Sequence, residues 1–251
     1  MKNKQLFFVI LSLLCGDIAS AEETSWSLAS SVYSKYIGKI GAIFSGDPIL
    51  VNELDWSRGD LFAGIWNSTG LDRYPYGSTY ADELDLWFGY GHTFDWIHVQ
   101  TDVAYYTVKD LTRMNDDLWV VEGEVSLSKI PFVQPYVSFC QFEKVDRNSF
   151  PGGMFYWAGI RRTQPLGFSV GKTKQTLNLD LMTAYSNGAL GKNPGFVFER
   201  LTVNLPIVLS GRMTLTPSVV LQSPIGGQDH HQVAYTTKDE VVWGVSAGYK
   251  F

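Results

Sequence analysis

The C-terminal segment has the clearest pattern of hydrophobic and polar positions in the chain. From Val241 to Phe251 every second residue is apolar, and most residues between them are small or polar. A period of two is the side-chain period of a β-strand, and a helix cannot use it. A strand of a water-soluble sandwich rarely stops on an aromatic residue, because chain ends fray. The segment therefore predicts a membrane-spanning strand with its apolar face toward lipid.

The same alternation recurs in about twelve segments. The predicted strands cover residues 26–39, 48–56, 60–67, 82–93, 96–108, 117–128, 132–143, 153–163, 175–185, 195–205, 212–222 and 240–251. Most are close to the roughly nine to eleven residues that a tilted strand needs to cross a bilayer. An even number of strands is typical of bacterial barrels. The predicted fold class is therefore all-β, a single antiparallel transmembrane β-barrel of about twelve strands.

The lengths of the connections provide a second test, because such barrels have short periplasmic turns and longer extracellular loops. Residues 57–59, 94–95 and 206–211 are short gaps, and they alternate with long gaps such as 68–81 and 223–239. Residues 164–174 break the rule, since a long gap falls where a short turn is expected. Either the preceding strand runs further or two strands are miscounted, which leaves ten or fourteen strands open.

The first 21 residues have the order of a secretory signal. Two lysines precede an apolar run from Leu6 to Leu14, and the small residues Ala19-Ser20-Ala21 follow. The apolar run is too short for a membrane helix. Leu14 precedes Cys15 where a lipoprotein signal needs a small side chain, so we do not expect lipidation. We expect a cleaved signal peptide at 1–21 and a barrel domain at 22–251 in the outer membrane of a Gram-negative bacterium.

Composition narrows the class further. The chain is 14% aromatic with 24 glycines, and its mean hydropathy is -0.03. No stretch after the signal has the 18 or so consecutive apolar residues of a membrane helix. Removing the signal leaves Cys140 as the one cysteine, which excludes an internal disulfide and a cysteine-based zinc site. The formal net charge of -5 argues against a nucleic-acid partner.

Two stretches resemble a known family. Ser34-Lys35-Tyr36 with Gly38, followed by the segment 61–68, is similar to the start of the TorF-like porins. Residues 82–90 and 102–106 look like the following hairpin of that family. The resemblance implies a small outer-membrane β-barrel classed as a porin. It implies no general substrate and no catalytic residue, so it supplies no site to carry over.

A search for catalytic and binding motifs finds none with the required geometry. Residues 167–173 look like a phosphate-binding loop, but three residues separate the glycines where four are needed, so a turn is expected. His230 and His231 are adjacent, and neighbouring strand residues point to opposite faces. His92 and His98 fall near the periplasmic strand ends and lack the His-x-Ser arrangement of barrel lipid hydrolases. We expect no catalytic residue, no metal and no cofactor; a lipid hydrolase is a less favoured alternative.

The polar faces of the strands carry mostly acids. A Lys or Arg facing lipid at mid-depth would cost about 2 to 4 kcal/mol, so the charged residues should point into the lumen. The predicted lumen-lining residues are Glu53, Asp55, Glu83, Asp85, Asp102, Glu122, Glu124 and Asp180, with the bases Lys35, Arg200, Lys250 and one of Arg161 and Arg162. This excess of acids predicts a water-filled passage that favours cations. A closed or plugged lumen, in which the acids pair with the few bases, remains the alternative.

The favoured function is therefore a porin-like barrel that lets small hydrophilic solutes diffuse. Loops 68–81 and 223–239 are expected to fold over the mouth. Expected partners are outer-membrane lipid, the solutes, and the barrel-assembly machinery, for which Trp243, Tyr249 and Phe251 resemble the C-terminal signal. A structural or adhesive barrel that displays its loops is the main alternative, and a soluble periplasmic β-protein is the third. The sequence identifies no solute and no oligomeric state.

Overall fold

The structure is a computed structural model of the chain. It describes residues 23–71, 82–108, 117–130, 132–144, 152–189, 194–225 and 237–251. The predicted signal peptide, His230-His231 and most of loops 68–81 and 223–239 lie outside these residues. No helix in the described part of the chain is long and apolar enough to cross a membrane.

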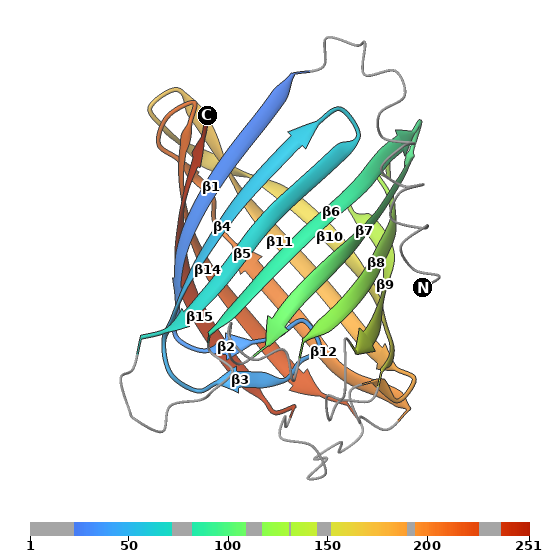
Figure 1. Ribbon diagram of the computed structural model, residues 1–251. Coiled ribbons are helices and arrows are strands. Elements are labelled where there is room, and N and C mark those ends of the chain that lie inside the picture. The colour runs from blue at the N-terminus through green and yellow to red at the C-terminus, as the bar shows by residue number, and fades with distance from the viewer. Residues whose placement is uncertain are drawn as a thin grey trace.

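Twelve long antiparallel strands close into one barrel, as predicted (Figure 1). The long strands are β1 (Thr24–Tyr33), β4 (Ile49–Arg58), β5 (Leu61–Gly70), β6 (Glu83–Phe94), β7 (Ile97–Val108), β8 (Leu118–Leu127), β9 (Gln134–Lys144), β10 (Gly153–Val170), β11 (Thr173–Ser186), β12 (Gly195–Asn204), β14 (Met213–Pro224) and β15 (Glu240–Lys250). The short strands are β2 (Tyr36–Ile37), β3 (Ile43–Ser45) and β13 (Ile207–Val208). Pairing of β1 with β15 closes the barrel, which leaves no long edge to be satisfied by water.

The alternation along each strand separates the two faces of the wall. In β6, Leu86, Phe88 and Tyr90 are exposed on the outside, whereas Glu83 and Asp85 are buried on the inside. An apolar outer surface matches the hydrocarbon of a bilayer, and polar groups are accommodated in the interior.

The short turns all lie at one end of the barrel. Residues 59–60, 95–96 and 171–172 join neighbouring strands there, and the backbone N–H of Phe251 donates to the carbonyl of Trp26 at the same end. Gly59 and Gly171 have φ of 57° and 58°, values that two-residue hairpin turns require. We call this end of the barrel the short-turn end.

The irregular gap at 164–174 is explained by strand length. β10 has 18 residues and β11 has 14, and their turn is at 171–172. The prediction that the preceding strand runs further was therefore right, and counts of ten or fourteen strands are excluded. The sequence at 167–173 forms the end of this hairpin, so the expected turn in place of a phosphate loop is confirmed.

The predicted strand over 26–39 was too long. β1 ends at Tyr33, and residues 34–48, which we call the inward loop, leave the wall and enter the barrel. Figure 1 shows β2 and β3 of this loop at the lower end of the barrel, away from the C-terminus. Gly41 allows the sharp change of direction, because its φ is 78° and an added Cβ would lie 2.4 Å from the ring of Phe198.

Candidate functional site

The inward loop is held by four parts of the wall. Tyr36 donates a 2.5 Å hydrogen bond to Glu83 on β6, and Lys39 forms an ion pair with Glu122 on β8. On the other side, the guanidinium of Arg200 on β12 donates to the carbonyl oxygen of Gly38 at 2.9 Å. Gln222 on β14 donates to the carbonyl of Gly41, also at 2.9 Å. Because β6, β8, β12 and β14 lie on different sides of the barrel, the loop crosses the lumen.

The tip of this loop packs into a dry core of buried apolar side chains. Ile40 and Ala42 at its tip are almost fully buried among apolar side chains that point inward from β7 to β12. The wall residues in this cluster are Ala104, Leu118, Val120, Cys140, Phe142, Phe155, Trp157, Ala184, Val197 and Phe198, with Ala189 beyond β11. Burial of apolar surface holds the loop against the wall. The side of the lumen bounded by these residues is therefore filled with protein.

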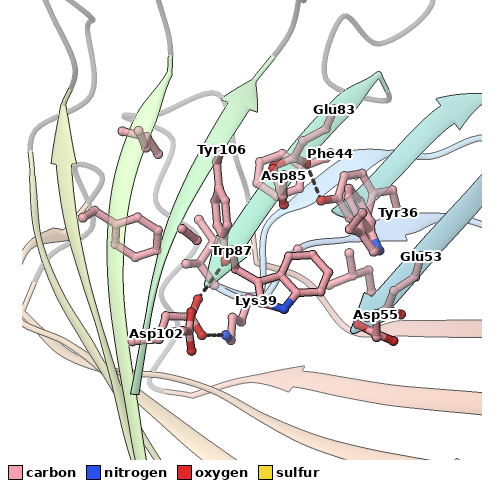
Figure 2. Close-up of a pocket in the computed structure, with 18 of the residues that line it drawn as sticks. Tyr36, Lys39, Phe44, Glu53, Asp55, Glu83, Asp85, Trp87, Asp102 and Tyr106 are labelled. Carbon is pink, nitrogen blue, oxygen red and sulfur yellow. Dashed lines mark hydrogen bonds and ion pairs between the residues drawn. The ribbon is translucent and has the colours of Figure 1, made fainter. Parts of the chain in front are cut away.

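A cavity of about 550 Å³ remains on the other side, between the inward loop and strands β4 to β8 (Figure 2). Six of the predicted acids line it: Glu53, Asp55, Glu83, Asp85, Asp102 and Glu122. Seven aromatic residues share the lining: Tyr36, Phe44, Phe62, Trp66, Trp87, Tyr106 and Phe142. Lys39 is the single Lys or Arg among the described lining residues.

The larger aromatic rings fit in this wall because glycines stand beside them. An added Cβ at Gly64 would lie 2.1 Å from the Trp87 ring, and one at Gly89 would lie 2.3 Å from the Phe62 ring. Distances under 3 Å are steric clashes, so these two positions allow the rings to lie along the wall and leave the cavity open.

Two groups of the inward loop have shifted acidities. Burial, together with the nearby charge of Glu83, raises the pKa of the Tyr36 hydroxyl well above its ordinary value, so this hydroxyl remains a donor. Burial alone would lower the pKa of the Lys39 ammonium. The charge of Glu122, its hydrogen bond to Lys39 and the nearby Cys140 and Asp102 together outweigh that effect and raise the pKa, so Lys39 stays charged.

A second, smaller cavity of about 230 Å³ continues toward the short-turn end. Its lining includes the ion pairs of Arg161, whose guanidinium donates to both carboxylate oxygens of Glu124, at 2.6 and 2.8 Å, and to Asp180 at 3.4 Å. The same guanidinium lies 3.9 Å from the ring centre of Tyr136. Glu124 and Asp180 are therefore paired with an arginine, whereas most acids of the larger cavity have no Lys or Arg partner among the described residues.

The remaining charged residues lie elsewhere. Lys35 pairs with Glu240 at 2.5 Å, at the start of β15 opposite the short-turn end. Arg200 binds the inward loop and lines neither cavity. Of the two neighbouring arginines, Arg161 points inward and Arg162 is exposed. Lys250 is exposed at the short-turn end.

The C-terminal aromatic residues lie on the outer face of the barrel. Trp243, Tyr249 and Phe251 are all exposed on or just after β15. The rings of Tyr249 and Phe251 meet edge to face with centres 5.0 Å apart.

His92 and His98 lie at the short-turn ends of β6 and β7. His92 Nδ1 lies 2.7 Å from Asp60 Oδ2, and His98 Nδ1 lies 3.0 Å from the Thr93 hydroxyl. No serine hydroxyl is bonded to either ring among the hydrogen bonds of the described residues. The described residues also contain no group of three or more His, Cys, Asp or Glu side chains placed to hold a metal ion.

The functional part that the sequence analysis missed is the inward loop. Loops 68–81 and 223–239 were expected to set access, but they lie mostly outside the described residues. Tyr36, Lys39 and Phe44, which the sequence analysis did not place inside the barrel, line the larger cavity from the loop side. The available signal was the apolar character of residues 37–44, which is unusual for a solvated loop.

A closed twelve-stranded barrel with an apolar outside and a polar inside has the fold of outer-membrane porins. Among solved structures, the KdgM porin superposes with a TM-score of 0.53 at 7% identity, covering 90% of this chain and 99% of that one. The NanC porin gives the same TM-score at 8% identity, covering 90% and 100%. A second KdgM structure is described as a complex with disordered oligogalacturonate. No family model and no curated protein matches the sequence.

Proposed function

We propose that this chain is an outer-membrane, porin-like barrel that lets small hydrophilic solutes diffuse passively and favours cations. The observation that carries the proposal is that two cavities beside the inward loop, each with carboxylates in its lining, share four lining residues. Lys39, Gln100, Asp102 and Glu122 line both. We infer that the two cavities join into a path lined by charged and aromatic side chains, from the level of Asp85 to that of Asp180.

The preference for cations follows from the charges along this path. The larger cavity has six carboxylates and one ammonium group in its lining. A narrow cavity with low-dielectric walls concentrates the field of these charges, which attracts cations and repels anions. The inward loop narrows the path, so only small solutes can pass beside it.

The test is electrical. The chain without its predicted signal peptide is refolded in detergent and inserted into planar bilayers, and the reversal potential is measured across a KCl gradient. Discrete channels with a higher permeability for K⁺ than for Cl⁻ are expected. Asp102→Asn, in the shared part of the lining, should reduce the preference for K⁺, whereas Asp95→Asn in an exposed turn should leave it unchanged. Anion-selective channels would refute the role of the acids.

A non-conducting structural or adhesive barrel is the second candidate. The dry core around Ile40 and Ala42 favours it, because this core fills one side of the lumen. The acids would then serve to hold the inward loop, as Glu83 and Glu122 do. Refolded barrels that shift on a detergent gel but never conduct would support this candidate over the porin.

The location and the family belong to the same proposal. The signal-like first 21 residues, the barrel fold and the aromatic end at Phe251 support export to the outer membrane and recognition by the barrel-assembly machinery. The resemblance at 34–38 and 61–68 supports the TorF-like porins as the family. Membrane fractionation tests the location, and extraction of the protein by buffer alone would overturn it.

A further inference from the structure

Acidic and aromatic side chains alternate in one row across four neighbouring strands. Glu53 pairs in register with Trp66, Trp66 with Asp85, and Asp85 with Tyr106. All four side chains line the larger cavity. Each carboxylate in this row therefore has an aromatic residue beside it.

The inward loop adds two more rings opposite this row. The ring centres of Tyr36 and Trp66 are 5.6 Å apart, and those of Tyr36 and Phe44 are 5.1 Å apart. In Figure 2 these two loop residues and Trp87 lie around the same space that Asp85 and Glu53 border. The aromatic surfaces therefore belong to both the wall and the loop.

One acceptor in the cavity has no partner. Asp85 is 9% exposed, and its Oδ1 oxygen is buried without a hydrogen bond from any described residue. A buried acceptor atom that has lost water and gained no donor costs free energy. A ligand that brings an N–H donor to this oxygen would remove that cost.

These features together specify the chemistry of a ligand. Carboxylates attract a cation. Aromatic faces also attract a cation, and they pack against the hydrocarbon part of a ligand. The unpaired oxygen of Asp85 needs a hydrogen-bond donor. A bare metal ion would gain little from the aromatic lining. A neutral sugar would leave the carboxylates without a counter-charge, and an anion would be repelled.

We infer that the larger cavity is a binding subsite for organic cations with a primary ammonium or guanidinium group on a short hydrocarbon chain. The inference rests on the proposed function, because it names the class of solute that the passage would select. A volume of about 550 Å³ is within the range of small-molecule sites. Lys39 faces Glu122, which leaves Asp85, Glu53 and Asp55 without a Lys or Arg partner among the described residues.

The probe is 1,5-diaminopentane, compared with 1,5-pentanediol and with Mg²⁺. The diol has the same chain length without charge, and Mg²⁺ has the same charge without hydrocarbon. Tryptophan fluorescence of the refolded barrel in detergent reports binding, since Trp66 and Trp87 line the cavity. Channel current in planar bilayers reports block.

We expect 1,5-diaminopentane to give a saturable fluorescence change and to block the current. Its half-maximal concentration should be at least tenfold below that of Mg²⁺. The diol should have no effect. Channels that conduct but show neither block nor saturable fluorescence would refute the subsite and leave the passage standing. Saturable fluorescence without channels would refute the passage and leave the subsite standing. Equal effects of the diamine and Mg²⁺ would refute the assignment to organic cations.

Two variants locate the subsite. Asp85→Asn keeps the size of the side chain and should weaken diamine binding at least tenfold, while Asp95→Asn is the charge-matched control outside the cavity. Trp66→Leu should weaken binding of the diamine more than that of Mg²⁺. If Trp66→Leu fails the heat-modifiability test for folding, Trp66→Phe replaces it and should give an intermediate loss. Unchanged binding in Asp85→Asn would refute the subsite.

Discussion

Lys39 on the inward loop forms an ion pair with Glu122 in the middle of β8, on the side of the barrel away from the strands that carry the loop. Glu122 also accepts a 2.7 Å hydrogen bond from the hydroxyl of Tyr106. One wall carboxylate thus holds the loop and lines both cavities. The position of the loop and the charge of the path are therefore coupled.

Replacement of Lys39 tests this coupling. Lys39→Gln removes the one Lys or Arg from the described lining of the larger cavity, so the path becomes more negative. We expect a higher K⁺ to Cl⁻ permeability ratio and a larger single-channel conductance, because the loop also loses one of its attachments. Lys129→Gln is the matched control, because Lys129 forms an exposed ion pair with Asp95 outside the cavity. A lower K⁺ preference in Lys39→Gln would contradict the proposed role of the acids.

The buried thiol of Cys140 can report whether the loop stays in place. Cys140 is fully buried in the core that packs against the loop, and the chain's other cysteine lies in the predicted signal peptide. We expect a polar thiol reagent to leave the folded barrel unmodified. Gly41→Ala strains a position with φ of 78° and brings a Cβ against Phe198, so it should dislodge the loop and speed modification.

The matched variant for that experiment is Gly211→Ala. An added Cβ at Gly211 has no atom within 4 Å, and this glycine lies in a short turn far from the loop. Modification of Cys140 at the same rate in both variants would show that the loop is not what protects the thiol.

Much of the barrel could be predicted from sequence because the pattern of each strand is local. In β6 the acids at 83 and 85 face inward and Leu86 and Phe88 face outward, as alternation requires. The strand number followed from repeating that pattern. The inward positions of Glu83, Asp85 and Asp102 follow from the same parity, whereas the register that brings Trp66 beside Asp85 depends on turn lengths.

The inward loop could not be predicted, because its contacts are distant in sequence. Gly38 and Arg200 are separated by 162 residues, and Gly41 and Gln222 by 181. The extent of β10 was left open for a different reason. Proline is unusual inside a strand, but pairing with β9 stops at Arg161, so Pro165 lies where β10 is paired with β11 alone.

Truncation of Ile40 measures how strongly the core holds the loop. Ile40 is 3% exposed within the core cluster, so Ile40→Ala should lower the free energy of unfolding by about 2 to 5 kcal/mol. Urea unfolding of the refolded barrel, followed by tryptophan fluorescence, gives the value. Ile65→Ala removes the same atoms from the lipid-facing surface and should have a smaller effect in detergent. An equal loss of unfolding free energy in the two variants would mean that packing of Ile40 in the core does not stabilise the barrel.

The C-terminal aromatic residues should matter for assembly in cells more than for the stability of the finished barrel. Trp243 and Phe251 are 64% and 66% exposed and make few contacts that a substitution could remove. We therefore expect Phe251→Ser to refold in detergent like the unmodified chain, with the same heat-modifiable mobility. The amount of folded barrel in the outer-membrane fraction of expressing cells should fall severalfold. Val241→Ser, an equally outward position at the other end of β15, is the control, and an equal fall in both variants would assign the defect to lost apolar surface instead of a terminal signal.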